Sequence, residues 1–341
     1  MNPACSRLFA LFLIAGSYWM ATPCQARDPG ELFPELSPFK EGRLQAGKIH
    51  SLWYGLLGNP DGKPVIVLHG GPGAGCYPRL TQYFNPEKFL IILHDQRGAG
   101  QSRPAGELRE NTTWDLVEDI NRLREHLKIK GKTLIFGGSW GTCLGLAYAE
   151  KYPENVSGMI LRGIFTGTQA EISQVCAGPG MRLFFPDAVK RLQAAMPDGA
   201  EITPKTLYGL LVEGDRATSW KAAEAWVRYG IKTSRLHAPH EKVNMDFGDW
   251  DIRPICRIDA HYMINRCFLE EAQLLLNADR LKDIPVTIIN GRYDMICPPL
   301  TAYKLHEQAP NSKLYIVEET GHSETEPGTT RKLLEAVADF E

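Results

Sequence analysis

Residues 133–149 read Thr133-Leu-Ile-Phe-Gly-Gly-Ser139-Trp-Gly-Thr-Cys-Leu-Gly-Leu-Ala-Tyr-Ala149. An apolar run rich in strand-forming residues leads into a serine between glycines, and a helical pattern of small residues follows it. The segment Gly137-Gly-Ser-Trp-Gly141 fits the G-x-S-x-G pattern of a nucleophile elbow, a tight strand-to-helix turn that exposes the serine hydroxyl. The glycines suit such a turn, because the strained serine backbone brings its neighbours too close for a Cβ. Since a glycine- and serine-rich loop is most often a plain turn, the interpretation depends on the other parts of a catalytic site.

The surrounding chain alternates strand-like runs with helical patterns. Short, continuously apolar runs are typical of strands in a parallel sheet that is covered on both faces. After the cap sequence Asn111-Thr-Thr-Trp-Asp115, apolar residues recur every 3.6 positions as far as Leu127, which predicts a helix. The alternation predicts an α/β fold with a doubly wound, mostly parallel sheet. The expected strands are residues 51–57, 64–69, 89–94, the run before Ser139, 159–165, 285–290 and 313–317, and a closing helix is expected over 331–340.

A change of rhythm divides the chain. Between about residues 168 and 277, strand-like runs disappear, and aromatic or charged helical patterns replace them. We interpret 168–277 as a helical cap inserted into an α/β core formed by residues 27–167 and 278–341. At its start, residues 27–45 are rich in Pro, Glu and Gly and are expected to form an arm that lies over the core. A chain of 341 residues is long enough to bury a full core of this kind.

The first 26 residues are expected to be a secretory signal peptide. Residues 1–7 carry one positive charge, residues 8–21 are apolar, and Cys24-Gln-Ala26 offers a small-residue cleavage site. An uncleaved anchor is the alternative, because the basic region is weak. We therefore expect a secreted or periplasmic protein with no stable membrane association once the signal is cleaved.

Composition argues against several classes of partner and cofactor. The formal net charge of −2, with 43% hydrophobic and 23% charged residues, gives no basic excess for nucleic acid. The cysteines outside the leader show neither CxxC nor metal-ligand spacing, so no metal and no cofactor are expected. An exported protein can form disulfides, but this spacing demands none. These cysteines are Cys76, Cys143, Cys176, Cys256, Cys267 and Cys297.

Two downstream segments supply the partners that a nucleophilic serine needs. A serine hydroxyl reacts only when a base removes its proton, and the base needs an anion to orient it. In a doubly wound sheet of this type the order is Ser, then Asp or Glu, then His, each after a strand. Asp294 follows the strand expected at 285–290, and His322 follows the one at 313–317. His306 is the competing histidine, but it falls inside a helical pattern and is interpreted as a surface residue.

Backbone amides near the serine are candidates for an oxyanion hole. Acyl transfer develops negative charge on the carbonyl oxygen, and each donor to it contributes roughly 3–4 kcal/mol. The amide of Trp140, directly after the serine, is one candidate. The other is the amide of Gly71 in His69-Gly-Gly-Pro-Gly73, a loop that follows the first buried strand. Cys143 and Cys297 fall near the expected site and are interpreted as small core residues.

With these residues assembled, the chain resembles the proline iminopeptidase family, the prolyl aminopeptidases of the α/β-hydrolase fold. The resemblance extends from about Phe33 to Phe340. It implies Ser139 as nucleophile, Asp294 as orienting acid and His322 as base. It also implies release of an N-terminal residue, typically proline, from a peptide with a free N-terminus. The matching segments are His69–Gly73, Asp95–Gly98, Asn111–Leu116, Gly137–Gly141, Leu161–Phe165, Gly291–Asp294 with Cys297–Pro299, and Gly321–Ser323.

The resemblance also implies carboxylates that bind the ammonium group of the substrate, because a buried cation needs a charged partner. The family commonly has two glutamates for this purpose in the cap. This chain has Gly230 where the first is expected and Asp259, one methylene shorter, at the second. Asp259 is thus the candidate substrate-binding residue, and a helix-surface aspartate is the alternative interpretation. The residues that could compensate are Glu213, Glu224 and Glu241.

Two other functions remain open. The missing carboxylate leaves room for an esterase, lactonase or amidase on the same scaffold. A non-catalytic binding protein that retained the fold is a third hypothesis, and the complete set of Ser, Asp and His argues against it. No oligomeric state is predicted.

Overall fold

The structure is a computed structural model that describes residues 30–236, 246–248 and 250–341. The signal peptide expected over residues 1–26 therefore lies outside the described residues. Within the part of the chain that is described, no helix is both long and apolar enough to cross a membrane.

An eight-stranded sheet organises the core, in the order β1-β2-β4-β3-β5-β6-β7-β8. The strands from β4 to β8 in this order are all parallel, whereas β2 runs antiparallel to both of its neighbours. The expected doubly wound, mostly parallel sheet is therefore confirmed. The strands are β1 (Lys40–Ala46), β2 (His50–Gly58), β3 (Lys63–Leu68), β4 (Phe89–His94), β5 (Thr133–Gly138), β6 (Val156–Arg162), β7 (Val286–Gly291) and β8 (Ser312–Val317).

Strand β1 departs from the expected arm. Residues 40–46 pair with β2 along the edge of the sheet, and most of their side chains are exposed or half-buried. An edge strand of this kind has no apolar run, so the sequence pattern does not reveal it. The residues before it do lie on the core, where Leu32, Phe33 and Leu36 pack against buried side chains.

Strand β6 also ends earlier than expected, because Gly163 adopts a left-handed conformation with φ of 63°.

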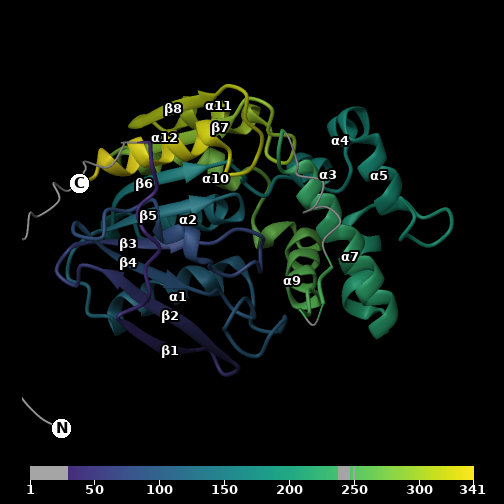
Figure 1. The fold of residues 1–341 in the computed structure, drawn as a ribbon, viewed down its shortest axis with the longest axis horizontal. Coiled ribbons are helices and arrows are strands. Elements are labelled where there is room, and N and C mark those ends of the chain that lie inside the picture. Colours follow the sequence, from purple (N-terminus) through teal and green to yellow (C-terminus); the bar gives the residue numbers. More distant parts are fainter. Residues whose placement is uncertain (1–29, 237–245, 249) are drawn as a thin grey trace, which may run out of the picture.

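Helices cover both faces of the sheet (Figure 1). Alternate residues of β3 show why: Ile66 and Leu68 face one apolar cluster, and Val65 and Val67 face the other. Helices α1, α2, α10 and α11 pack in the first cluster, and α12 packs in the second. The core helices are α1 (Thr113–His126), α2 (Trp140–Lys151), α10 (Gln273–Leu276), α11 (Pro299–Gln308) and α12 (Pro327–Ala338), with short turns η1 (Pro78–Thr81), η2 (Pro153–Asn155) and η5 (Ala278–Leu281).

The described elements from α3 to α9 form helices and turns that lie beside the sheet, to the right in Figure 1. They enclose an apolar cluster of their own, to which Met181, Leu192, Leu211, Trp226 and Cys256 contribute. This region is therefore a separate layer above one end of the sheet. Its elements are α3 (Gln169–Val175), α4 (Pro179–Phe184), α5 (Pro186–Gln193), α6 (Pro204–Tyr208), η3 (Gly209–Glu213), α7 (Arg216–Thr233), α9 (Arg253–Ile264) and η4 (Arg266–Phe268).

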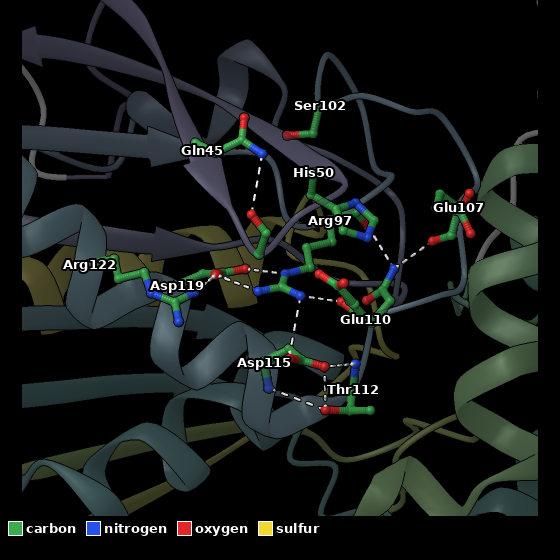
Figure 2. Close-up of polar contacts among 12 residues, drawn as sticks. Gln45, His50, Arg97, Ser102, Glu107, Glu110, Thr112, Asp115, Asp119 and Arg122 are labelled. Atoms are coloured by element: carbon green, nitrogen blue, oxygen red, sulfur yellow. Dashed lines mark hydrogen bonds and ion pairs between the residues drawn. The ribbon is translucent and has the colours of Figure 1, made fainter.

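A buried ion pair fixes the loop after β4 to helix α1 (Figure 2). The Arg97 guanidinium, 2% exposed, donates to Asp119 through Nε at 2.6 Å and through Nη2 at 2.8 Å. Arg97 also donates to the backbone carbonyl of Glu110, and Asp115 lies 3.4 Å from Nη1. Two parallel bonds define the geometry of the pair, and Arg122, 3.1 Å from Asp119, adds a second cation beside the buried carboxylate. The loop after β4 is thereby connected to α1 by buried, charge-assisted hydrogen bonds.

Candidate active site

Ser139 lies in the turn between β5 and α2, as the elbow pattern predicts. Its backbone has φ of 56° and ψ of −124°, a strained conformation for a residue other than glycine. A Cβ on Gly137 would overlap the carbonyl of Gly141, and one on Gly141 would overlap the carbonyl of Leu68. The amide of Ser139 donates to the carbonyl of Arg162 at 2.8 Å, which ties the turn to the end of β6. The glycines therefore permit the close approach of strand, turn and helix that holds the serine in place.

Asp294 and His322, which follow β7 and β8, meet at the same edge of the sheet. The distance between His322 Nδ1 and Asp294 Oδ2 is 2.7 Å. The other oxygen of Asp294 accepts from the amides of Ile296 at 3.0 Å and Cys297 at 2.7 Å, so the carboxylate cannot rotate freely. Because a carboxylate only accepts, Nδ1 carries the proton, and Nε2 has the lone pair that a base needs.

Ser139 and His322 line one cavity of about 210 Å³. Within the described residues, no hydrogen bond joins the serine hydroxyl to the histidine ring, and catalytic contacts of this kind often shorten only when substrate binds. The structure thus brings the three predicted catalytic residues to one site, with the Asp–His pair formed and the serine beside it. His306 lies elsewhere, on α11, where its Nδ1 is 2.7 Å from the Ser312 hydroxyl.

Sequence patterns did not reveal a second set of contacts around His322. Arg162, at the end of β6, donates through Nη1 to the carbonyl of His322 at 2.8 Å and lies 3.4 Å from its Nε2. Glu324 is 3.6 Å from the same guanidinium and accepts from the Tyr77 hydroxyl at 2.6 Å. These contacts connect the histidine loop to the end of β6 and to Tyr77. The group is assembled from three distant segments of the chain, so no local sequence pattern could have identified it.

The predicted oxyanion donors flank the serine. Gly71 lines the cavity with φ of 115°, and a Cβ there would lie 2.7 Å from the amide nitrogen of Gly73. Trp140 is fully buried and is the first residue of α2, where main-chain amides have no partner within the helix. Cys143 and Cys297 are both buried, and Cys297 lines the cavity. In the described residues all six cysteines are free.

Asp259 points into the same cavity from α9. Its Oδ2 accepts from the indole Nε1 of Trp226 at 2.6 Å, whereas its Oδ1 is buried without a partner. Burial raises the pKa of the Asp259 carboxyl to about 6, although the Trp226 hydrogen bond acts in the opposite direction. A buried carboxylate with an unpartnered oxygen favours a cation or a donor beside it. The remaining wall is apolar and consists largely of Phe165, Val175, Met181, Trp226, Met263 and Ile296.

No second carboxylate of the described residues lines this cavity. Gly230 does line it, and a Cβ at this position would meet no atom within 4 Å. Glu213 is exposed at the end of η3, and Glu241 lies outside the described residues. Glu224 lines a larger hollow, of about 360 Å³, between α5 and α7, where it pairs with Arg228. That hollow contains none of the predicted catalytic residues, so the smaller cavity is the candidate active site.

Comparisons with known proteins agree with this fold and with the sequence motifs. A family model described as "alpha/beta hydrolase fold" matches residues 63–324. A probable proline iminopeptidase of Leptolyngbya boryana is 43% identical over 312 residues, which cover 91% of this chain and 97% of that protein. A proline iminopeptidase of Arabidopsis thaliana is 40% identical over 309 residues, covering 89% and 80% of the two chains.

Solved structures support the fold alone. A proline iminopeptidase-related protein from Thermus thermophilus superposes with a TM-score of 0.59 at 20% identity, covering 88% of this chain and 97% of that one. An esterase from Exiguobacterium antarcticum also gives 0.59 at 20% identity, covering 87% and 98%. The chain therefore belongs to the α/β-hydrolase fold family and, within it, to the proline iminopeptidase family. The resemblance inferred from the motifs is thereby confirmed.

Proposed function

We propose that the protein is a serine aminopeptidase that releases an N-terminal residue, preferentially proline, from peptides through an acyl-enzyme formed on Ser139. The observation that carries this proposal is the position of Asp259. Asp259, whose Oδ1 is buried without a partner, lines the same cavity as Ser139 and His322. An N-terminal ammonium group bound there would neutralise the buried carboxylate and leave the first peptide bond near the serine.

The cavity itself supports a small first residue. Its volume of about 210 Å³ is below the roughly 300–1,000 Å³ of pockets for drug-sized ligands. Its apolar wall suits a pyrrolidine ring, whereas the single carboxylate supplies the one charged contact. The relatives named as proline iminopeptidases point to the same substrate class.

The proposed reaction follows from the roles of the three side chains. His322 Nε2 removes the proton of the Ser139 hydroxyl, and the oxygen attacks the carbonyl carbon of the first residue. The amides of Gly71 and Trp140 donate to the oxyanion, and Asp294 stabilises the imidazolium that forms. The imidazolium then protonates the leaving amine, and a water molecule, activated by the same histidine, hydrolyses the acyl-enzyme.

A pair of substrates that differ only at the amine tests this proposal. The first is a prolyl arylamide with a free amine, and the second is its N-acetylated twin. Turnover of the free amine and its loss on acetylation are the expected results, because only an ammonium group can pair with Asp259. Alanyl arylamide is the control for the proline preference. Equal or faster turnover of the acetylated twin would contradict the proposal.

An esterase, lactonase or amidase is the second candidate, favoured by one observation. Gly230 leaves the cavity wall without a side chain, so the binding site has one carboxylate where two would hold an ammonium group more tightly. A neutral ester or lactone needs neither of these carboxylates. Faster turnover of neutral esters than of free prolyl substrates at pH 7–8 would favour this candidate.

We also propose that residues 1–26 direct export and are then removed, which would make the mature protein secreted or periplasmic. The charged start, the apolar run and the Cys24-Gln-Ala26 site support this. Cell fractionation followed by N-terminal sequencing tests it. A new N-terminus at Arg27 is expected, and an intact Met1 in the cytoplasmic fraction would refute it.

A further inference from the structure

The backbone that would bind the oxyanion lies on a buried polar network outside the cavity. His69, 1% exposed, follows β3 and begins the loop that contains Gly71. Its Nδ1 is 2.9 Å from the carbonyl oxygen of Gly70, and its Nε2 is 3.0 Å from the amide nitrogen of Gln96. Both ring nitrogens of this histidine are therefore engaged by the main chain.

These contacts determine where the proton of His69 lies. A backbone amide only donates, so Nε2 must accept from Gln96 and carries no proton. Burial lowers the pKa of His69, so the ring is neutral and its single proton is on Nδ1. That proton is donated to the carbonyl oxygen of Gly70 at 2.9 Å. The amide of Gly75, 3.3 Å from Nδ1, then faces a donor, so this contact is not a hydrogen bond in that tautomer.

The bonds that the Gly70 carbonyl accepts, from His69 at 2.9 Å and from the amide of Ala74 at 3.3 Å, set the direction of the Gly71 amide. The carbonyl of Gly70 and the N–H of Gly71 belong to one planar peptide group, so they point in opposite directions. When His69 holds the carbonyl on its side, the N–H of Gly71 points away from the ring. Consistently, Gly71 lines the active-site cavity, whereas Gly70 and His69 line a separate small hollow. Donation to the carbonyl also polarises the peptide and strengthens its N–H as a donor.

The side chain of Gln96 joins this loop to the elbow. Its Nε2 donates to the carbonyl of His69 at 3.1 Å, and its Oε1 accepts from the indole Nε1 of Trp140 at 2.9 Å. The indole only donates and the carbonyl only accepts, which fixes the orientation of the amide group. Gln96 and Trp140 are 3% and 0% exposed, so these bonds do not compete with water. Gln96 thus links the loop that carries the Gly71 amide to the residue that carries the other oxyanion donor.

We propose, on the basis of the serine mechanism above, that His69 and Gln96 are positioning residues that hold the Gly71 and Trp140 amides in oxyanion-binding geometry before substrate arrives. Neither residue lines the active-site cavity. The residue after Gln96 is Arg97, which forms the buried ion pair with Asp119 shown in Figure 2. This pair connects the segment that contains Gln96 to α1. Preorganised donors act on the charge that develops in the transition state, so their loss should lower kcat and leave KM nearly unchanged.

Two substitutions and a matched control test the proposal. His69→Phe and Gln96→Met keep size but remove the hydrogen bonds. His50→Phe is the control, because His50 is also fully buried and also bonds a backbone carbonyl, that of Arg109, away from the site. A p-nitrophenyl acetate assay is used, since ester hydrolysis on Ser139 needs the same oxyanion hole whatever the peptide preference. If the wild type hydrolyses this ester but no prolyl substrate, the aminopeptidase proposal fails while the present test stands.

The expected loss in kcat for each network variant is about 100-fold, with KM within about twofold of wild type. The inhibition constant of a small alkyl boronic acid, which forms a tetrahedral adduct with the serine, should rise by a similar factor. The His50→Phe control should retain kcat within about twofold. The proposal would be overturned by a rise in KM with unchanged kcat or by an unchanged inhibition constant for the boronic acid. An equal loss of kcat in the His50→Phe control would also overturn it.

Gln96→Glu keeps the test decisive if the larger changes prevent folding. A glutamate retains the acceptor for Trp140, but its second oxygen faces the His69 carbonyl and can bond it only when protonated. The ratio of variant to wild-type kcat should therefore increase as the pH is lowered from 8 to 5. A ratio that stays constant with pH would show that the Gln96 donor does not position the loop.

Discussion

Replacing Asp259 by asparagine should stabilise the protein at neutral pH while removing its preference for free amines. Burial raises the pKa of this carboxyl from 3.8 to about 6. The folded state therefore holds the proton more tightly than the unfolded chain, and stability should fall as the pH rises from about 4 to about 6. At about 1.4 kcal/mol per pH unit, the carboxylate costs up to about 3 kcal/mol of folding free energy above pH 6. Asparagine keeps the acceptor for Trp226 and avoids this cost.

Urea denaturation of both proteins at pH 4 and pH 8 measures the effect on stability. The difference between Asp259→Asn and wild type should be small at pH 4 and should approach about 3 kcal/mol in favour of the variant at pH 8. Equal stability of the two proteins at pH 8 would refute the claim that the Asp259 carboxylate is buried with one oxygen unpartnered.

The effect of the same substitution on activity is measured as the ratio of kcat/KM for two substrates. Because His322 serves both, the ratio of kcat/KM for free and N-acetylated prolyl arylamide isolates the contribution of Asp259. In wild type this ratio should fall as the pH drops below about 6, where Asp259 becomes neutral. In Asp259→Asn it should be low and independent of pH. A variant that lost activity on both substrates equally would show that Asp259 only supports α9.

Three further substitutions address the nucleophile, the cavity wall and the loop anchor. Ser139→Ala should lower kcat by at least about 10⁴-fold and abolish labelling by a fluorophosphonate, and persistent labelling would identify another nucleophile. Gly230→Ala should raise the free energy of unfolding by about 0.5–1 kcal/mol, because glycine weakens a helix interior, while raising KM for substrates with a bulky first residue. A lower melting temperature would contradict this. Arg97→Met should cost about 3 kcal/mol in urea denaturation, because the buried Asp119 loses two hydrogen bonds and keeps the half-exposed Arg122, at 3.1 Å, as its charged partner, and a loss below about 1 kcal/mol would show that the pair is dispensable.

The sequence predicted the parts of the fold that have a local pattern. Apolar runs identified the buried parallel strands, because a strand covered on both faces needs apolar side chains throughout. The positions after those strands then identified Asp294 and His322, since the carboxyl ends of parallel strands meet at one edge. The glycines around Ser139 predicted the nucleophile elbow, and the structure shows the steric reason for each of them.

Other features depend on contacts between distant segments and have no local pattern. Tyr77 and Glu324 are 247 positions apart, and Arg162 and His322 are 160 apart. The edge strand 40–46 is formed by pairing with β2, and its own composition resembles a loop. The partner of Asp259, the Trp226 indole, also comes from a different helix. Such groups become visible only when the topology of the chain is known.

The arrangement separates the chemistry of the site from its selection of substrate. The serine, its acid and base, and the oxyanion amides all lie on turns of the sheet, and buried hydrogen bonds through Gln96 join the two oxyanion segments. Asp259 and Gly230 instead lie on α9 and α7, in the layer of helices that the sequence predicts to be a cap. The two layers meet where the Trp140 ring packs edge to face on Tyr262 of α9 at 4.6 Å, and where the Tyr262 hydroxyl donates to Asn111 at 2.9 Å. Because the oxyanion donors do not depend on cap side chains for their hydrogen bonds, substitutions at Asp259 and Gly230 can change the substrate while the acyl-transfer machinery stays intact.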